Sequence, residues 1–388
     1  MRVAVYHPWV YLKSGLERTL LELKRRSRHD WTILTSHYDA EGTYPELRDM
    51  GVTELKRVSV KRRYGTVIRA AATVVSTRIN PKEYDVLVIS CEGLGSLLNF
   101  RNHSKPVVCL CFTPLRAVYD SFYRSTRFQL VGKKWLLPMI WMAETSFRCI
   151  DRLAWRYYSR VFCISEAIKK RVLKARLASP DRIEVAYPGI DRRRIEASDT
   201  FEPFFFLPGR IMWTKNVELG IEAFLRLQRQ TPCDFELVIA GMVDAKSQPY
   251  IKHLRELAAE SDKIRFIIGP SDEEMFDLYK RCYATLFTAF NEDLGLTPLE
   301  AMTFGKPPIA VRRGGPCETI TDRVNGRLTD PTPEAFCTIM SEFVDNPETV
   351  RELGRNGPEQ AGKFTWDVFV AQIDDYLDQV SRENHAGE

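Results

Sequence analysis

Long apolar runs are missing from this chain of 388 residues. The longest apolar window lies around Trp135 to Met142 and is interrupted by Pro138, whereas a membrane-spanning helix needs about 20 predominantly apolar residues. The stretch from Met1 to Tyr6 reads as a strand and lacks the positive and then apolar pattern of a signal peptide. We therefore expect a cytoplasmic protein whose only contact with a membrane is peripheral, on the inner face.

Cysteine and histidine offer little chemistry. The nine cysteines are odd in number, and no C-x-x-C or Cys/His ligand spacing accompanies them, while Cys109 and Cys111 alternate within an apolar, strand-like run. This usage predicts reduced, mostly buried thiols. The six histidines lie outside the motifs described below, which leaves few groups for acid and base catalysis. The sequence also has no internal repeat and no low-complexity segment.

The composition is that of a globular protein, with 44% hydrophobic and 28% charged residues. The net charge of +5 hides an asymmetry, because residues 1–200 hold 36 of the 56 Lys and Arg but only 20 of the 51 Asp and Glu. A basic first half can attract an anionic membrane surface, a phosphorylated acceptor or nucleic acid. Since no nucleic-acid-binding motif accompanies the charge, we expect no nucleic-acid partner.

Short apolar runs alternate with longer helical patterns, which predicts βαβ units and a parallel sheet. The pattern restarts after a stretch rich in Pro and Gly, residues 187–191, so the α/β chain is divided near Asp191 to Glu202. We predict one Rossmann-like domain over residues 1–195, a second over 196–365, and a helix over 366–388. The predicted strands are Arg2 to Tyr6, Trp31 to Ser36, Asp85 to Ser90, Val107 to Phe112, Arg160 to Ser165, Phe204 to Leu207, Phe235 to Ala240, Ile264 to Ile268, Ala284 to Phe290 and Pro308 to Val311.

The segment from Asn291 to Glu300 carries the strongest functional signal. A predicted strand ends in a loop with Glu292, and a helix that begins near Thr297 or Pro298 carries Glu300. The free amides of a first helical turn attract a diphosphate, while carboxylates on either side can accept hydrogen bonds from sugar and ribose hydroxyls. The alternative is a surface acid followed by an acid near a helix start.

This segment strongly resembles the family 4 retaining glycosyltransferases, whose signature is E-x-x-G-x-x-x-x-E-A-M-x-x-G-x-P. The resemblance implies the GT-B fold, in which two doubly wound domains face each other across a cleft, and a C-terminal helix that crosses back to the first domain. It also implies that Glu292 contacts the transferred sugar, that Glu300 holds the ribose, and that amides of Leu294, Gly295 and Leu296 approach the diphosphate. The matching residues are Glu292, Gly295, Glu300, Ala301, Met302, Gly305 and Pro307.

A second element, with Gly209, Arg210, Lys215 and Asn216, follows a predicted strand and precedes a helix. It resembles the family's G-R-x-x-x-x-K-N element. An Arg fork and a Lys point charge that converge on one diphosphate would neutralise the leaving group without a metal. The alternative is two solvated basic residues at a helix start, where the helix dipole disfavours cations.

The first domain matches the family less closely. The loop with Ser14 and Gly15 stands where the family commonly has Gly-Gly and brings amides to the donor phosphate, so Gly15 keeps this expected role.

The segment Phe112-Thr113-Pro114-Leu115-Arg116, which runs on to Asp120, resembles H-T-P-x-R-x-x-x-D of the mannosyltransferase-like members. Phe112 replaces a His that would reach the sugar or acceptor. Ser14, Phe112, Thr113, Arg116 and Asp120 are therefore the candidate acceptor or sugar contacts.

Basic residues are interleaved with aromatic and aliphatic ones from Lys61 to Arg78 and from Tyr123 to Arg160. These stretches predict a surface that docks on an anionic membrane and receives a lipid-linked acceptor. The alternative is that the aromatic residues are core and the basic ones a solvated face.

The resemblance implies retaining transfer of a hexose to a glycan or lipid-linked acceptor, as in polysaccharide biosynthesis. GDP-mannose is expected as donor ahead of a UDP-hexose. Arg210, Lys215 and Glu292 are the expected catalytic residues, and we expect no metal and no cofactor, because no D-x-D pair is placed for one. Two alternatives are a nucleotide-sugar epimerase on the same scaffold and a non-catalytic protein that binds nucleotide sugars.

Overall fold

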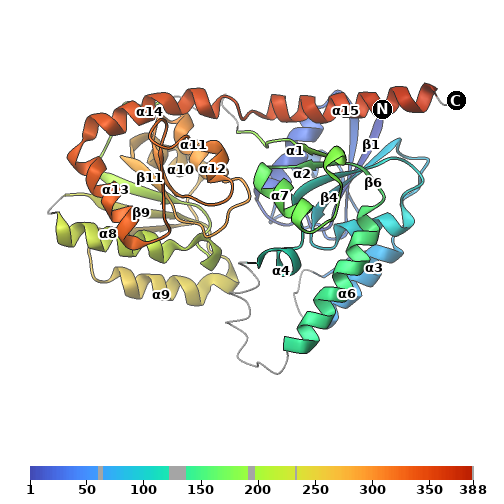
Figure 1. The fold of residues 1–388 in the computed structure, drawn as a ribbon, viewed down its shortest axis with the longest axis horizontal. Coiled ribbons are helices and arrows are strands. Elements are labelled where there is room, and N and C mark those ends of the chain that lie inside the picture. Colours follow the sequence, from blue (N-terminus) through green and yellow to red (C-terminus); the bar gives the residue numbers. More distant parts are fainter. Residues whose placement is uncertain (60–63, 122–136, 191–196, 232–233, 387–388) are drawn as a thin grey trace. The chain divides into compact units, whose positions relative to one another are not determined.

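The computed structural model describes residues 1–59, 64–121, 137–190, 197–231 and 234–386. The chain divides into two compact units (Figure 1). Unit 1 comprises Met1–Pro188 and Trp366–Glu388, and unit 2 comprises Gly189–Thr365. Each unit is built on a parallel sheet with helices between its strands, which confirms the predicted fold class.

Unit 1 contains a seven-stranded sheet in the order β3-β2-β1-β4-β5-β6-β7, in which every neighbouring pair is parallel. Its strands are β1 (Arg2–His7), β2 (Asp30–Thr35), β3 (Val52–Glu54), β4 (Val86–Glu92), β5 (Val107–Thr113), β6 (Tyr158–Cys163) and β7 (Ile183–Val185). Its helices are α1 (Gly15–Arg26), α2 (Glu46–Asp49), α3 (Tyr64–Ser76), η1 (Gly95–Arg101), α4 (Arg116–Tyr119), α6 (Leu137–Trp155), α7 (Glu166–Lys174), η3 (Pro180–Arg182) and α15 (Trp366–Ala386).

Unit 2 contains a six-stranded parallel sheet in the order β10-β9-β8-β11-β12-β13. Its strands are β8 (Phe204–Pro208), β9 (Glu236–Gly241), β10 (Ile264–Ile268), β11 (Ala284–Phe287), β12 (Pro308–Val311) and β13 (Arg327–Thr329). Its helices are η5 (Trp213–Lys215), α8 (Val217–Gln230), η6 (Ala245–Ser247), α9 (Gln248–Ala258), α10 (Asp272–Arg281), α11 (Leu296–Thr303), α12 (Pro316–Thr319), α13 (Pro333–Asp345) and α14 (Pro347–Ala361).

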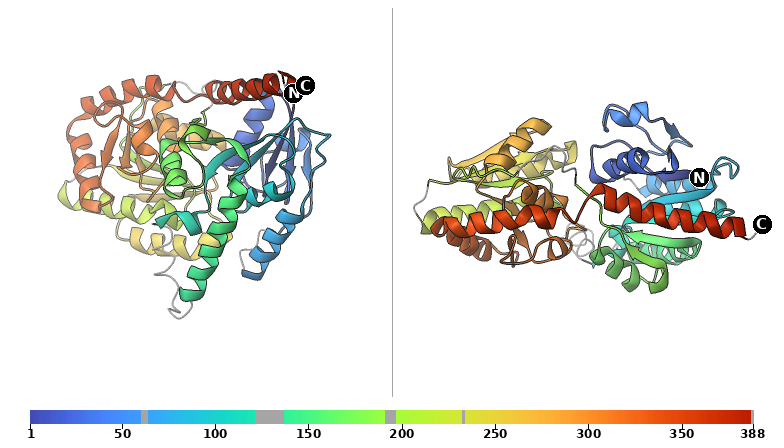
Figure 2. Two further views of the ribbon diagram at one scale, coloured as in Figure 1. Left: turned by 45° about the vertical axis from the view of Figure 1, so that its right-hand side comes forward. Right: turned by 90° about the horizontal axis from the view of Figure 1, so that it is seen from above.

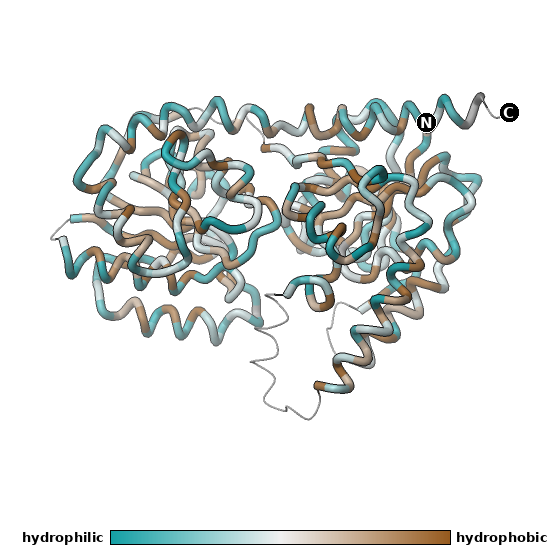
Figure 3. The backbone as a smooth tube through the Cα atoms, in the orientation of Figure 1, coloured by the Kyte–Doolittle hydropathy of each residue, from teal (hydrophilic) through white to brown (hydrophobic). Residues whose placement is uncertain are grey.

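The central strands are covered on both faces, and their sequences are correspondingly apolar throughout. Strand β5 is VVCLCFT and strand β8 is FFFLP, with almost every residue buried, as expected where helices lie on both sides of a parallel sheet. Figure 3 shows the hydrophobic residues gathered on the strands within each unit and hydrophilic residues on the outer helices. This pattern explains why the interior strands are readable from sequence.

Helix α15 lies along α1 within unit 1 (Figure 2). The buried Asp374 accepts hydrogen bonds from Ser27 Oγ at 2.5 Å and from the Arg28 amide at 3.0 Å. Arg28 also reaches Asp375 at 2.7 Å and Asp378 at 2.6 Å. Because exposed ion pairs contribute little, the buried Asp374 contacts stabilise this packing more than the Arg28 ion pairs do, beside the buried apolar residues of α15 such as Phe369 and Leu377.

Candidate active site

Strand order in unit 2 singles out one place on the sheet edge. From β8 the chain proceeds to β9 on one side, and the later strand β11 lies on its other side. Open parallel sheets bind ligands beyond the carboxyl ends of their strands at such a switch point. The loops that leave β8 and β11 there carry Lys215 and Glu292.

Lys215 and Glu292 lie 77 residues apart in sequence and form a direct ion pair. The distance from Lys215 Nζ to Glu292 Oε2 is 2.5 Å, and each side chain is about one quarter exposed. The backbone of η5 is fixed to the exit of β11, because Thr288 Oγ1 donates to the Lys215 carbonyl at 2.8 Å. The pair therefore presents a neutral, partly open combination of an ammonium and a carboxylate to solvent.

The loop that carries Glu292 lies against two glycines that follow β12. A Cβ on Gly314 would stand 2.3 Å from the Glu292 carbonyl oxygen, and one on Gly315 would stand 2.2 Å from Leu294 Cα. The Gly315 amide donates to the Glu292 carbonyl at 2.9 Å. Only residues without a side chain fit this approach, so the Gly314-Gly315 turn sets the position of the Glu292 backbone.

Helix α11 begins directly after this loop. Gly295 is its N-cap residue with φ 81°, and no side chain caps the first turn, which also contains no acidic residue. Leu296 is the first helical residue, and Leu294 is buried. An uncapped helix start with a left-handed glycine leaves backbone amides and the positive end of the helix dipole for an anion.

Glu300 lies on α11 one helical turn further on. Tyr279 Oη, from α10, donates to Glu300 Oε2 at 3.0 Å. Burial raises the pKa of Glu300, and the hydrogen bond from Tyr279 lowers it in part. The Tyr279 ring is itself fixed by stacking on Phe304, with centroids 5.3 Å apart. Tyr279 is a positioning residue that the sequence analysis did not single out, and no local motif marks it.

The remaining candidates of this element follow β8. Gly209 has φ +131°, and Asn216 takes the left-handed conformation with φ 50° as the residue that precedes α8. Asparagine is among the few non-glycine residues that adopt this conformation readily. Arg210 is exposed, and no ion pair to it occurs among the described residues. Lys215 and Glu292 are thus brought into direct contact, whereas neither Arg210 nor Glu300 forms a hydrogen bond or ion pair with them among the described residues.

In unit 1, a buried carboxylate accepts hydrogen bonds from the loop that is predicted to bind the donor phosphate. Ser14 is the N-cap of α1 and Gly15 is its first residue. The buried Glu17 accepts a hydrogen bond from Ser14 Oγ and one from the Leu12 amide at 3.2 Å. Glu17 was not predicted as a site residue, although the S-x-x-E spacing of Ser14 and Glu17 is a known helix-start signal.

Arg171, on α7, organises the other unit 1 candidates. It donates to Thr113 Oγ1 at 2.7 Å and pairs with the buried Asp120 at 3.5 Å. Phe112 is a buried residue of β5, and Arg116 begins α4. Asp120 therefore pairs with Arg171, a residue that no spacing in the sequence connects to it.

The described part of α6 carries exposed apolar residues at helical spacing. Met139, Met142, Ile150 and Leu153 are all exposed, and their separations of three to eight residues place them on one face. Other parts of the predicted docking surface, among them Arg62, Arg63, Lys133 and Lys134, lie outside the described residues. Among the helices that the structure describes, none has the length and apolarity to cross a membrane.

Metal-ligating side chains gather elsewhere. Within the described residues, only one group of three or more His, Cys, Asp or Glu side chains converges closely enough to hold an ion, and it consists of Cys91, Cys109 and Cys111 in unit 1. Glu292 and Glu300 do not belong to it. The candidate site in unit 2 therefore combines a lysine, two separate carboxylates and a helix start.

Two family models match the chain in succession. The model described as Glycosyltransferase Family 4 matches residues 13–194, and the one described as Glycosyl transferases group 1 matches residues 190–360. Among curated proteins, the alpha-1,3/1,6-mannosyltransferase ALG2 of Mus musculus is 27% identical over 94% of this chain and 93% of its own length. The D-inositol 3-phosphate glycosyltransferase of Salinispora tropica is 27% identical over 53% of this chain and 48% of its own length.

Solved structures share the fold. HepE from Anabaena, in complex with UDP and glucose, aligns with a TM-score of 0.74 at 19% identity and covers 98% of this chain and 100% of its own. WaaG, a glycosyltransferase involved in lipopolysaccharide biosynthesis, aligns with a TM-score of 0.69 at 15% identity, over 96% and 99% of the two chains. At these identities the likeness establishes the fold, and it confirms the predicted GT-B class.

Proposed function

We propose that this chain, which belongs to the family 4 glycosyltransferases, moves mannose from GDP-mannose to a glycan or lipid-linked acceptor. The models described as Glycosyltransferase Family 4 and Glycosyl transferases group 1 together match residues 13–360. The mannose assignment is supported by relatives named mannosyltransferases that match over 89% and 94% of the chain. The observation that carries the site assignment is the Lys215–Glu292 ion pair at the switch point of unit 2.

The proposed chemistry needs a positive site beside a group that reads the sugar. Lys215 and Arg210 neutralise the charge that develops on the leaving diphosphate, and the uncapped amides of α11 donate hydrogen bonds to its oxygens. Glu292 exchanges its ion pair with Lys215 for hydrogen bonds to the sugar hydroxyls. Glu300, already oriented by Tyr279, accepts from the ribose hydroxyls.

Transfer on this scheme proceeds with retention of the anomeric configuration. The bond from the sugar C1 to the phosphate oxygen breaks while the bond from C1 to the acceptor oxygen forms on the same face. The acceptor hydroxyl gives its proton to the leaving phosphate oxygen. Because Lys215 and Arg210 supply the positive charge, the step uses no metal ion, and catalysis rests on positioning and electrostatics.

The acceptor side belongs to unit 1 in this proposal. The exposed apolar face of α6 supports peripheral docking on a membrane that carries the acceptor lipid. Replacing Met139 and Met142 by Ser is expected to weaken sedimentation with anionic vesicles. Val368→Ser is the matched control, because Val368 is an exposed apolar residue of α15. Equal sedimentation of both variants would remove the docking surface from the proposal.

The function is tested by following nucleoside diphosphate release from GDP-mannose in the presence of lipid-linked oligosaccharide acceptors. Lys215→Ala and Glu292→Ala should each lower turnover by about 10²–10³-fold. Lys263→Ala is the control, since Lys263 forms an exposed ion pair with Asp234 at 2.8 Å in the same unit. Full turnover in either site variant contradicts the assignment, and turnover with UDP-hexoses alone would replace the donor.

A further inference from the structure

Four cysteines that have no motif in the sequence lie on three neighbouring strands in the middle of the unit 1 sheet. Cys91 of β4 is the register partner of Cys111 of β5, which is in turn the partner of Cys163 of β6. Cys109 precedes Cys111 by two residues on β5 and therefore faces the same side of the sheet. Parallel pairing brings together cysteines that are 20 residues apart on β4 and β5 and 52 residues apart on β5 and β6.

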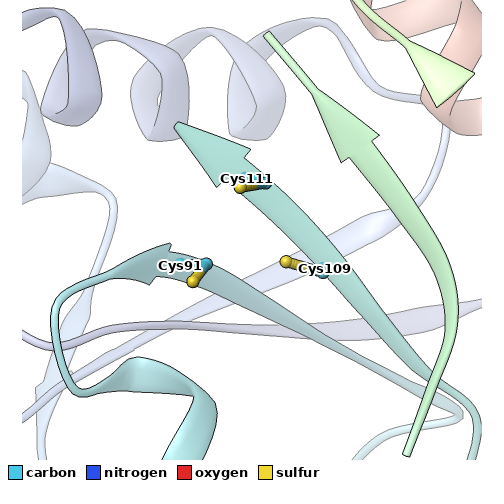
Figure 4. Close-up of side chains that lie close together, drawn as sticks. All are labelled: Cys91, Cys109 and Cys111. Carbon is cyan, nitrogen blue, oxygen red and sulfur yellow. The ribbon is translucent and has the colours of Figure 1, made fainter. Parts of the chain in front are cut away.

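Three of these thiols, on the adjacent strands β4 and β5, lie close together (Figure 4). The sulfur atoms of Cys91, Cys109 and Cys111 all lie within 4.8 Å of one another, and all three residues are buried. A metal–sulfur bond of about 2.3 Å places the sulfurs of one coordination shell about 4 Å apart. The thiols therefore need to move by less than about 1 Å to share an ion.

Tyr158 lies on β6, the strand next to the one that carries Cys109 and Cys111, and has a buried hydroxyl. Tyr158 Oη forms no hydrogen bond among the described residues, and the side chain is 1% exposed. An unpaired buried hydroxyl is costly, and a thiolate sulfur bound to a metal is an acceptor that this donor lacks otherwise.

Ordinary core packing explains buried cysteines one at a time, since a thiol behaves as a small apolar side chain. It requires no convergence of three sulfurs, and a disulfide would use only two of them. Soft thiolate ligands in a dry site select thiophilic ions such as Zn²⁺ and Cu⁺. The third sulfur and the Tyr158 hydroxyl on the neighbouring strand favour a bound ion over both ordinary core packing and a disulfide.

We propose that Cys91, Cys109 and Cys111 bind a single thiophilic metal ion that joins strands β4 and β5. Each thiol that ligates the ion releases its proton to solvent as the metal–sulfur bond forms. The ion has no part in sugar transfer. Its place is structural, because Cys111 is followed directly by Phe112 and Thr113, so that binding would stiffen the strand end that leads into α4.

Because the thiols are buried, the ion is expected to enter during folding or through rare opening. The protein is therefore produced in medium supplemented with zinc or with copper, and separately stripped with a chelator under reducing conditions. Elemental analysis of the purified chain should give one ion per chain, and X-ray absorption should show a shell of sulfur ligands. Zinc or copper occupancy tells the two ions apart, and a shell of nitrogen and oxygen ligands would overturn the proposal.

Cd²⁺ added to the stripped protein is expected to produce an ultraviolet sulfur-to-metal band at one equivalent and to raise the melting temperature. Cys91→Ala, Cys109→Ala and Cys111→Ala should each abolish the band. Cys149→Ser and Cys317→Ser, which change exposed cysteines, should keep it. If one of the three cysteine-to-alanine variants fails to fold, its metal content cannot be compared with that of Cys149→Ser. In that case the ligand shell measured on the unmodified protein decides whether the site exists. A band that survives Cys109→Ala and Cys111→Ala together refutes the site.

Discussion

Replacing Lys215 by Met and Glu292 by Gln, singly and together, separates the structural role of this ion pair from its role in transfer. Both side chains are about three quarters buried, and the charged atoms are 2.5 Å apart. Exposed pairs contribute about 0–1 kcal/mol, and removal of one partner from a fully buried pair costs about 3–5 kcal/mol. Each single variant should therefore lose about 1–2 kcal/mol of unfolding free energy.

The double variant removes both charges, so it should recover part of this loss. Activity should behave differently, because the charge that Lys215 offers to the leaving diphosphate cannot be restored by neutralising Glu292. Loss of one such preorganised contact slows the chemical step by about 10²–10³-fold. A domain is typically stable by about 5–15 kcal/mol, so all three variants should remain folded at 25 °C.

The assay is a double-mutant cycle in which urea unfolding and steady-state sugar transfer are measured on the same preparations. The expected result is a stability coupling of about 1–2 kcal/mol together with a transfer rate that stays low in the double variant. If the double variant regains the transfer rate along with its stability, the pair is only structural. That outcome would refute the roles given to Lys215 and Glu292.

Three further outcomes follow from particular contacts. Gly315→Ala should reduce donor binding and the free energy of unfolding, because its Cβ would meet the backbone of the neighbouring loop at 2.2 Å. Gly65→Ala on α3 is the control, since a Cβ there meets nothing within 4 Å, and it should raise the free energy of urea unfolding by about 0.5–1 kcal/mol. Tyr279→Phe removes the hydrogen bond that lowers the pKa of Glu300, so the carboxylate is lost at a higher pH on acidification and the acid limb of nucleotide binding, measured by calorimetry, should move upward. Asp374→Ala leaves two donors at the end of α1 without their acceptor and should cost about 1–3 kcal/mol, with faster hydrogen exchange in α15; unchanged exchange would show that other contacts hold this helix.

The strands that could be predicted from sequence are those that carry a run of four or more mostly apolar residues. The predicted ranges Ile264 to Ile268 and Pro308 to Val311 coincide with β10 and β12. Strands β3, β7 and β13 were not predicted, because each has three residues and lies at a sheet edge. A strand of three residues at a sheet edge can form without a continuous apolar run, so the sequence carries no clear signal for it.

Strand β11 was predicted too long. It ends at Phe287 rather than at Phe290, because the residues that follow turn toward η5. Thr288 donates to the Lys215 carbonyl, and the Phe290 amide donates to Thr214 at 3.3 Å. These bonds are tertiary, and the apolar sequence from Ala284 to Phe290 carries no sign of them.

In the candidate site, too, local motifs could be predicted from sequence, whereas tertiary contacts could not. Lys215 and Glu292 each stand in a local motif, so the sequence indicated both, but their contact depends on β8 lying beside β11. Tyr279 and Arg171 were missed, because they act from helices distant in sequence on Glu300, Thr113 and Asp120. The sulfur cluster depends on the register between β4 and β5, which no spacing rule for metal ligands encodes.

The most direct test of the central claim is a thermal-shift comparison of GDP, UDP, GDP-mannose and UDP-glucose with the unmodified chain and with Lys215→Met. A ligand that binds only the folded state raises the melting temperature. We expect GDP and GDP-mannose to shift the unmodified chain, and the shift to be lost in the variant while its own stability falls by only about 1–2 kcal/mol. A full GDP-mannose shift in Lys215→Met, or no shift with any nucleotide in the unmodified chain, would contradict a donor site built on this ion pair.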